Sequence, residues 1–296
     1  MKKSFGATFS SNVGHIYLAN SNGFSGNYGR TSCNCGIYLQ SGEGDNLFDE
    51  GKYDFARNYK DLMPSEEIAK KAIHRVTRLI GAKKIETQAI PMVLEPDTAS
   101  FILGFLNTCV AGNNIYMKQS FLADKLGETI ANDNVTVIDD GLLPCGPGTR
   151  PFDDEGVPHR KTTVVEKGVL KSYLMNTYAA RKLNLKSTGN GYGANNLYLA
   201  PGKYTQEEII KSIDRGFLLT GTMGQGLNAS TGDISKGAFG IMIENGELTY
   251  PVAEITISGN LAEVLKNIEM VGNDLKHDGT IVSPTIKLTG LTIGGK

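Results

Sequence analysis

Carboxylates and glycines gather between two predicted strands near the middle of the chain. The segment 135–178 reads VTVIDDGLLPCGPGTRPFDDEGVPHRKTTVVEKGVLKSYLMNTY. Its carboxylates form two clusters, Asp139 with Asp140 directly after a buried-type strand at 135–138, and Asp153 with Asp154 and Glu155. Acidic side chains on such loops can hold a cation, a substrate amine or an arginine. They can equally cap turns by accepting hydrogen bonds from backbone amides, so both interpretations stay open.

Histidines could supply a metal site or a general base. A metallohydrolase helix needs two histidines one turn apart, as in H-E-x-x-H, so that both rings reach one metal. The four histidines, His15, His74, His159 and His277, are isolated, and no pair has that spacing. A zinc site assembled from distant histidines stays possible, and His74 is predicted to be a surface residue.

Thiols are the remaining candidate nucleophiles, because the serine motif G-x-S-x-G is absent. The four cysteines, Cys33, Cys35, Cys109 and Cys145, are too few and scattered for a disulfide framework, so we expect them to be reduced. Cys33 and Cys35 remain open as a redox or metal pair. Cys109 lies in an apolar helix and is predicted to be a packed hydrophobe, although pairing of Cys109 or Cys145 with His159 stays open.

Charge and composition exclude several classes of protein. Lysine and arginine total 30 against 31 acidic residues, and this balance does not favour nucleic-acid binding. No signal peptide opens the sequence MKKSFGATFSSNVG, and no apolar run is long enough for a membrane span. We therefore expect a cytoplasmic protein. Glycine is abundant, 36 of 296 residues, and this favours a β-rich chain with many turns.

The first part of the chain is predicted to be a β-meander followed by one helix. Residues 4–40 alternate as strands around a turn at 20–23, and 43–58 is predicted to be a loop. A helix capped by Ser65 follows and stops at Gly81. Its buried side is predicted to be Ile68, Ala72, Val76 and Leu79, with Lys70, Lys71, Arg75 and Arg78 on the solvated side.

The remaining elements must position the second carboxylate cluster, Asp153, Asp154 and Glu155, which we call the acidic corner. Residues 82–90 are predicted to be a linker, which divides the chain into a partial middle domain at 1–81 and a C-terminal domain at 82–296. An apolar helix at 99–111, capped by Asp97 or Thr98, is expected to be deeply buried.

Two hairpins are predicted in the C-terminal part. Lys167-Gly168 turns one, and Asn245-Gly246 turns the other over 237–252. Short helices are predicted at 176–185, after Thr205 and after Asn260, and a glycine-rich loop at 187–196. The fold class is α+β, with a C-terminal domain of antiparallel strands, hairpins and short helices.

Several long segments resemble the TldD/PmbA family, particularly its PmbA (TldE) branch. They are GTRPFDDEGVPHRKTTVVEKGVLKSYLMNTYAARKL, NNLYLAPG, GQGLNASTGDISKGAFGIMIENGELTYPVAEITISGNL, VGNDL and SPTIKLTGLTIGG. The resemblance implies a cytosolic metalloprotease system in which two kinds of subunit form a heterodimer around a chamber for unfolded peptides. The family is also associated with modulation of DNA gyrase, which no basic patch here supports.

The chain departs from the TldD branch at the metal motif. In that branch a helix carries H-E-x-x-x-H, whereas the corresponding place here is Ile102 to Cys109, without histidine or glutamate. The cysteine-containing insertion of the TldD branch is missing too, because His277 runs almost directly to Ser283. The family's N-terminal α/β domain has no counterpart ahead of the meander, so we expect a fragment or a shortened paralogue.

These departures give three hypotheses. The first is a PmbA/TldE-like subunit without catalytic, cofactor-binding or metal-ligating residues of its own, which expects zinc only through a TldD-like partner. The second is an independent metallopeptidase with a cryptic site assembled from distant residues. The third is a non-enzymatic module that self-associates through open strand edges. None of them includes a nucleic acid or a membrane as a partner.

Overall fold

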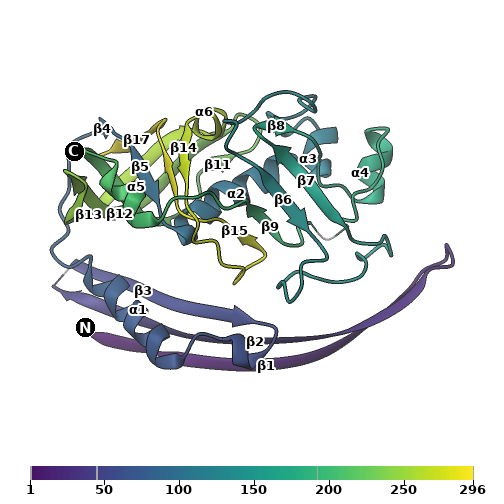
Figure 1. The fold of residues 1–296 in the computed structure, drawn as a ribbon, viewed down its shortest axis with the longest axis horizontal. Helices are drawn as coiled ribbons and strands as arrows, with labels where there is room; N and C mark the ends of the chain where they lie inside the picture. The colour runs from purple at the N-terminus through teal and green to yellow at the C-terminus, as the bar shows by residue number, and fades with distance from the viewer. Residues whose placement is uncertain (1, 45, 192, 296) are drawn as a thin grey trace.

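The computed structural model describes residues 2–44, 46–191 and 193–295. Helices and strands are both present and the strands form three sheets, so the predicted α+β class is confirmed. A long three-stranded sheet lies beneath the rest of the molecule, which contains the other two sheets and most of the helices (Figure 1). In the part of the chain that the structure describes, no helix is long and apolar enough to cross a membrane.

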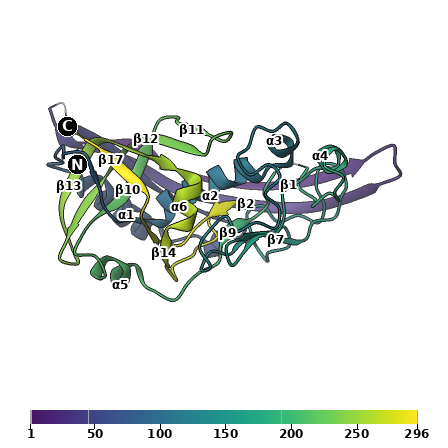
Figure 2. The same ribbon diagram turned by 90° about the horizontal axis from the view of Figure 1, so that it is seen from above.

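The long sheet is an antiparallel meander of β1 (Lys3–Ala19), β2 (Ser25–Glu43) and β3 (Asn46–Ala56) in that order. β1 and β2 run the length of the molecule, and the turn between them extends past α4 (Figures 1 and 2). The predicted turn after Ala19 is confirmed. The predicted loop at 43–58 is wrong, because 46–56 pairs with β2 as a third strand. Pairing to a neighbouring strand outweighs the polar composition of this segment.

One helix packs on the meander. After the short helix η1 (Tyr59–Asp61), α1 (Ser65–Thr77) buries Ile68, Ala72 and Val76, and Leu79 follows as a buried residue. The predicted buried side is therefore confirmed. Ser65 was expected to be the N-cap, but Pro64 holds that position and no side chain caps the helix. Gly81 ends the segment with a φ of +78°, a conformation that glycine adopts without strain.

A nine-stranded sheet forms one wall of the upper part, in the order β14-β16-β5-β10-β12-β13-β17-β4, with β11 paired to β12. Its strands are β4 (Gln88–Ala89), β5 (Met92–Leu94), β10 (Arg215–Met223), β11 (Leu227–Asn228), β12 (Asp233–Glu244), β13 (Glu247–Asn260), β14 (Ile268–Val271), β16 (Ile286–Leu288) and β17 (Leu291–Gly294). The hairpin of β12 and β13 is confirmed. Asn245 and Gly246 turn it with φ values of 51° and 77°, as a type I′ turn requires.

A five-stranded sheet has the order β15-β9-β6-β7-β8. Its strands are β6 (Val137–Asp140), β7 (Lys161–Glu166), β8 (Val169–Leu170), β9 (Leu197–Leu199) and β15 (Ile281–Val282). The hairpin turned by Lys167 and Gly168 is confirmed. The strand predicted at 135–138 lies two residues later, so Asp139 and Asp140 belong to β6 instead of following it. Pairing with both β7 and β9 extends the strand through these carboxylates.

Helix α2 (Pro96–Val110) is the central element, and its buried side chains belong to one core with residues of both upper sheets. The predicted deep burial is confirmed, but the helix begins before the expected caps. Glu95 is the N-cap residue and its side chain makes no capping bond. Thr98 lies inside the helix and donates its hydroxyl to the carbonyls of Glu95 and Leu219, at 2.9 and 2.8 Å.

The remaining helices are short. They are α3 (Gly112–Tyr116), α4 (Thr177–Lys182), α5 (Gln206–Lys211) and α6 (Leu261–Lys266). Thr205 and Glu208 form the expected capping box of α5, and the side chain of Asn260 caps α6 as predicted. These caps satisfy backbone amides that a helix leaves unpaired at its first turn.

Candidate functional site

Two cavities lie beside α2 and between the meander and the upper part of the molecule. The larger, of about 590 Å³, is lined by α1, by Lys52 of β3 and by the first turn of α2, where Pro96, Asp97 and Ser100 contribute. The smaller, of about 320 Å³, is lined by Asn107 near the end of α2 and by residues of β2. Because both cavities meet α2, this helix and its surroundings form the candidate site.

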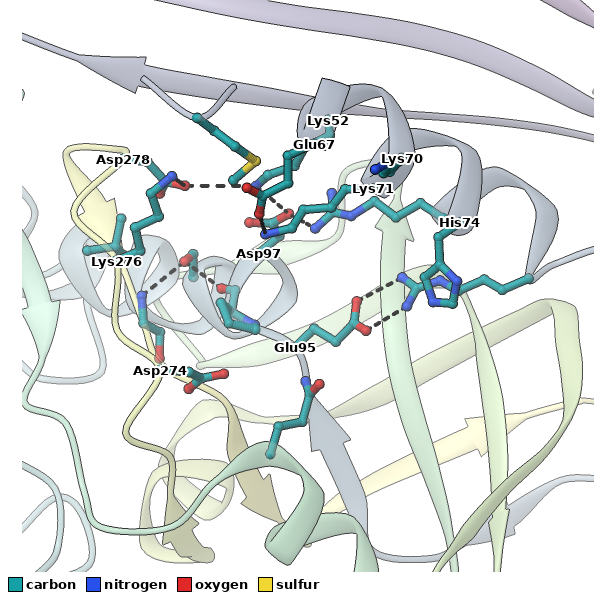
Figure 3. Close-up of a pocket in the computed structure, with 18 residues that line it drawn as sticks. Lys52, Glu67, Lys70, Lys71, His74, Glu95, Asp97, Asp274, Lys276 and Asp278 are labelled. Carbon is teal, nitrogen blue, oxygen red and sulfur yellow. Dashed lines mark hydrogen bonds and ion pairs between the residues drawn. The ribbon is translucent and has the colours of Figure 1, made fainter. Parts of the chain in front are cut away.

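Paired charges dominate the larger cavity (Figure 3). Arg78, the C-cap residue of α1, binds the carboxylate of Glu95 through two hydrogen bonds of 2.6 and 2.8 Å. Arg75 pairs with Asp97 at the start of α2. Two planar groups facing one another in the first arrangement make strong charge-assisted bonds. These pairs join the meander's helix to the segment that opens α2.

A second group of ion pairs joins β3 to α2 and to the loop before β15. Lys52 lies 3.9 Å from Asp97 and 3.8 Å from Asp278, and Lys276 pairs with the buried Asp54 of β3. Burial raises the pKa of Asp278, and its two lysine neighbours offset part of that rise. The cavity wall is thus a belt of ion pairs, and we call these contacts together with Arg75–Asp97 and Arg78–Glu95 the ion-pair belt.

The belt corrects one prediction. Arg75 and Arg78 were expected on a solvated helix side, but their side chains are only 22% and 11% exposed because Asp97 and Glu95 cover them. Lys70, Lys71 and His74 line the same cavity and remain exposed, as predicted for His74. The larger cavity therefore presents mainly charged side chains, and most of them form ion pairs.

The residues of α2 do not fit a metal. The segment 102–109 turns Ile102, Leu103, Phe105 and Leu106 into the core together with Cys109, and none of its side chains is an imidazole or a carboxylate. Within the described ranges no three His, Cys, Asp or Glu side chains come together as metal ligands would. Burial raises the pKa of the Cys109 thiol to about 12, which suppresses the thiolate that a metal or a nucleophilic role requires.

The acidic corner organises loops. The buried Asp153 accepts hydrogen bonds from the amides of Glu155, Val157 and Gly191, at 3.0, 2.9 and 2.9 Å. Glu155 accepts from the amide and hydroxyl of Thr177, at 2.8 and 2.7 Å, where α4 begins. Asp154 is exposed and lies 3.3 Å from Arg150. The structure therefore supports the capping of turns for Asp153 and Glu155, whereas Asp154 pairs with an arginine.

The carboxylate of Asp139 binds the glycine-rich loop at 187–196. It accepts from the side-chain amides of Asn190 and Asn195, at 2.8 and 3.0 Å, and from the Asn195 backbone amide at 2.7 Å. Burial raises the pKa of Asp139 although these donors act in the opposite direction. Asp140 accepts from the Leu142 amide at 3.0 Å and lies 4.0 Å from Lys161. Both residues fix local structure at the strand end.

The histidines and the remaining cysteines lie in different environments. His159 is buried, and neither ring nitrogen has a hydrogen-bond partner among the described residues. His277 packs edge-on against Tyr198 with ring centres 5.0 Å apart, and His15 lies 3.1 Å from the Asn27 side chain. All four cysteines are free thiols; Cys33 is buried, Cys35 is half-buried and Cys145 is exposed. Neither Cys109 nor Cys145 is therefore a hydrogen-bond partner of the His159 ring in the described structure.

Sequence reasoning missed the arginines that join the two parts. Besides Arg75 and Arg78, Arg57 donates to the carbonyls of Gly146, Pro147 and Thr149, at 3.1, 2.7 and 3.0 Å. The contacts between Arg57 and this loop span about 90 positions, so no local pattern indicates them. Only the i, i+3 spacing of Arg75 and Arg78 signalled a shared helix side.

Comparisons with known proteins agree with this architecture. Residues 2–80 match the model of the PmbA/TldA metallopeptidase central domain, and residues 87–295 match that of the C-terminal domain. Metalloprotease PmbA of Escherichia coli O157:H7 is 34% identical over 96% of this chain. The PmbA homologue of Haemophilus influenzae is 34% identical over 98% of it. The chain spans 64% of the length of each of these relatives.

Solved structures extend the comparison. A Thermotoga maritima protein described as a candidate modulator of a DNA gyrase is 32% identical, with a TM-score of 0.91 over 97% of this chain and 68% of that one. TldE of Thermococcus kodakarensis shares the fold, with a TM-score of 0.87 at 24% identity over 98% of this chain and 69% of that one. With the family models covering nearly its whole length, the chain belongs to the PmbA/TldD family.

Proposed function

We propose that this chain is a PmbA-type subunit of a two-component peptidase, non-catalytic by itself, which holds unfolded peptide while a TldD-like partner supplies the metal and the catalytic residues. The observation that carries the proposal is the set of side chains on α2. Where the related branch carries H-E-x-x-x-H, this helix presents apolar side chains, Asn107 and a thiol with a pKa of about 12. Its relatives are named PmbA metalloproteases, and this connects the chain to peptide cleavage.

The meander offers a surface for the partner. Phe9, Val13 and Tyr17 point to one side of β1, because strand residues two or four apart share a side, and they are 62%, 85% and 75% exposed. β1 is also the edge strand of its sheet, so one row of its backbone groups is free to pair. We call Phe9, Val13 and Tyr17 the β1 row. Exposed apolar groups on an open edge strand favour association with another chain.

The experiment combines assembly, metal content and activity. The chain and a TldD-like protein of the same organism are purified without chelators and run separately and together on size-exclusion chromatography with light scattering. We expect a stable complex, zinc only in the partner, and cleavage of an unfolded peptide only by preparations that contain the partner. About one zinc per chain, with chelator-sensitive cleavage by this chain alone, would instead establish an independent metallopeptidase.

Self-association is the competing outcome for the same surface. A second copy of this chain would also cover the β1 row, because an open edge strand pairs with any complementary strand. Light scattering of the isolated chain distinguishes the two. A homodimer that persists in the presence of the TldD-like protein would contradict the two-component proposal and favour a self-associating module.

A further inference from the structure

Three arginines converge on the smaller cavity beside α2, and none of the described residues that line it is acidic. Arg30 reaches it from β2, Arg57 from the end of β3 and Arg150 from the loop that follows β6. Tyr28, Asn107 and Ile281 complete the wall with backbone of the 147–149 loop. A cavity of about 320 Å³ is at the small end of the range for ligand sites and would enclose only one or two residues of a peptide.

The charge of Arg57 is held in place by neutral groups. Its guanidinium donates to the carbonyls of Thr31, Gly146, Pro147 and Thr149, between 2.7 and 3.1 Å. No carboxylate among the described residues lies within ion-pair distance of it, in contrast to Arg75 and Arg78 in the larger cavity. Burial lowers the pKa of Arg57, and the like charge of Arg30 lowers it further. A fixed, partly buried cation with a second cation beside it favours an anion between them.

Arg30 and Asn107 have side-chain donors that can complete such a site. The Arg30 side chain is exposed and makes no hydrogen bond or ion pair with a described residue, so its five N–H donors are available. Asn107 is half-buried on the side of α2 that meets the cavity, and its side-chain amide has no described partner either. Arg150 already lies 3.3 Å from Asp154, and it contributes charge at the wall.

The geometry points to a carboxylate-binding site for the C-terminal end of a peptide. Arg30 is the main residue that would bind the carboxylate, and Arg57 supplies a fixed positive charge. A guanidinium matches a carboxylate through two parallel N–H bonds, which a lysine does not reproduce. Tyr28 and Ile281 give apolar surface for the last side chain. The inference rests on the proposed function, because it assumes that the ligand of this chain is a peptide. It adds to that proposal a preference for chain ends.

The test measures binding of fluorescein-labelled peptides of one sequence by fluorescence anisotropy. Three forms are compared: a free C-terminal acid, the C-terminal amide, and an amide with an internal aspartate. We expect the acid to bind about tenfold more tightly than the plain amide, the scale of one charge-assisted contact. Equal affinity for acid and amide, or no measurable binding of either, would overturn the inference. Tight binding of the internal-aspartate peptide alone would also overturn it, because the site would then bind a side-chain carboxylate and not the C-terminal one.

Variants locate the effect. Arg30→Gln removes the free guanidinium without breaking a described contact and should reduce binding of the acid to the level of the amide. Arg181→Gln, at an exposed position of α4 that does not line this cavity, is the matched control and should leave both affinities unchanged. Arg57→Gln is a poorer test, because its contacts hold the 146–149 loop. If Arg30→Gln has no effect, the carboxylate binds elsewhere and the assignment fails.

Two further measurements separate this inference from its alternatives. Inorganic phosphate and chloride are titrated separately as competitors of the acid peptide. If phosphate displaces the peptide at a far lower concentration than chloride does, the cavity is a phosphate site instead. Assembly with the TldD-like partner is followed in parallel for the Arg30→Gln variant. A normal complex with equal binding of acid and amide contradicts only this inference. Selective binding of the acid without any complex contradicts only the two-component function.

Discussion

Arg78 and Glu95 form a two-bond ion pair that joins α1 to the residue preceding α2. Nη1 and Nη2 of the guanidinium lie 2.6 and 2.8 Å from the two carboxylate oxygens, and the side chains are 11% and 13% exposed. Charges removed from water to this extent are costly unless each keeps its partner. The pair therefore joins the meander and its helix α1 to the beginning of α2, the helix that borders both cavities.

Arg78→Met should destabilise the protein by about 3 kcal/mol, because it leaves the enclosed carboxylate of Glu95 without a partner. Chemical denaturation followed by circular dichroism measures the change. Lys71→Met is the matched control, since Lys71 pairs with Glu67 on the same helix while both are about half exposed. Exposed pairs contribute about 0–1 kcal/mol, so a similar cost for the two variants would show that the Arg78 pair is not structurally important.

The helical period of α1 could predict which residues are buried in the meander unit, but not what the opposite side meets. Ile68, Ala72 and Val76 share a side by local geometry alone. The contact between Arg78 and Glu95 depends on how two parts of the chain pack, and this information is absent from a window of neighbouring residues. The strand at 46–56 was missed for the same reason, because pairing with β2 stabilises a segment whose composition is polar.

The candidate site was harder to predict than the fold. Turn chemistry located the hairpins at Lys167-Gly168 and Asn245-Gly246, since glycine accepts the positive φ that these turns need. The composition of the acidic corner suggested a binding site, yet the Asp153 carboxylate accepts hydrogen bonds from three backbone amides. Arg30, Arg57 and Arg150 lie in three separate segments, and only the folded chain brings them to one cavity.

Asp97 gives the belt a pH dependence of defined sign. Burial acts to raise its pKa, but Arg75 and Lys52 outweigh burial and hold the pKa below its usual range. Since the folded pKa is below the unfolded value of about 4, the carboxylate stabilises the fold above that pH. The contribution is lost as pH falls through the lower folded pKa.

Denaturation of wild type and Asp97→Asn between about pH 7 and pH 3 tests this sign. The wild type should be the more stable at neutral pH by a constant margin, and the margin should shrink below about pH 4 as the carboxylate protonates. Asp133→Asn, at an exposed position outside the belt, serves as the control. A margin that grows on acidification would contradict the lowered pKa.

Cys109 should be chemically silent in the folded protein. It is 0% exposed and its thiol pKa is about 12, so almost no thiolate exists at pH 8 to attack iodoacetamide. The exposed Cys145 provides an internal comparison and should be alkylated readily. Peptide mapping by mass spectrometry, before and after denaturation, reports both sites. Alkylation of Cys109 in the native protein at a rate close to that of Cys145 would contradict this prediction and support the hypothesis that Cys109 is a reactive nucleophile.

The β1 row provides the most direct test of the proposed partner surface. Val13 is 85% exposed, so Val13→Lys should leave the thermal stability of the isolated chain nearly unchanged. In a complex that covers the row, the same change loses about 1.5 kcal/mol of apolar burial and adds the cost of enclosing an ammonium group. We therefore expect the affinity for a TldD-like partner to fall at least tenfold, measured by sedimentation or biolayer interferometry.

Asn12→Lys separates this effect from a general effect of charge. Asn12 is the preceding residue of the same strand and is also exposed, but its side chain points to the other side of β1. Both variants add one positive charge at the same sheet edge, so only the side of the strand differs between them. If the two weaken the complex equally, the edge backbone or the net charge governs assembly. A loss confined to Val13→Lys would assign the contact to the apolar side, where Phe9 and Tyr17 extend it along the strand.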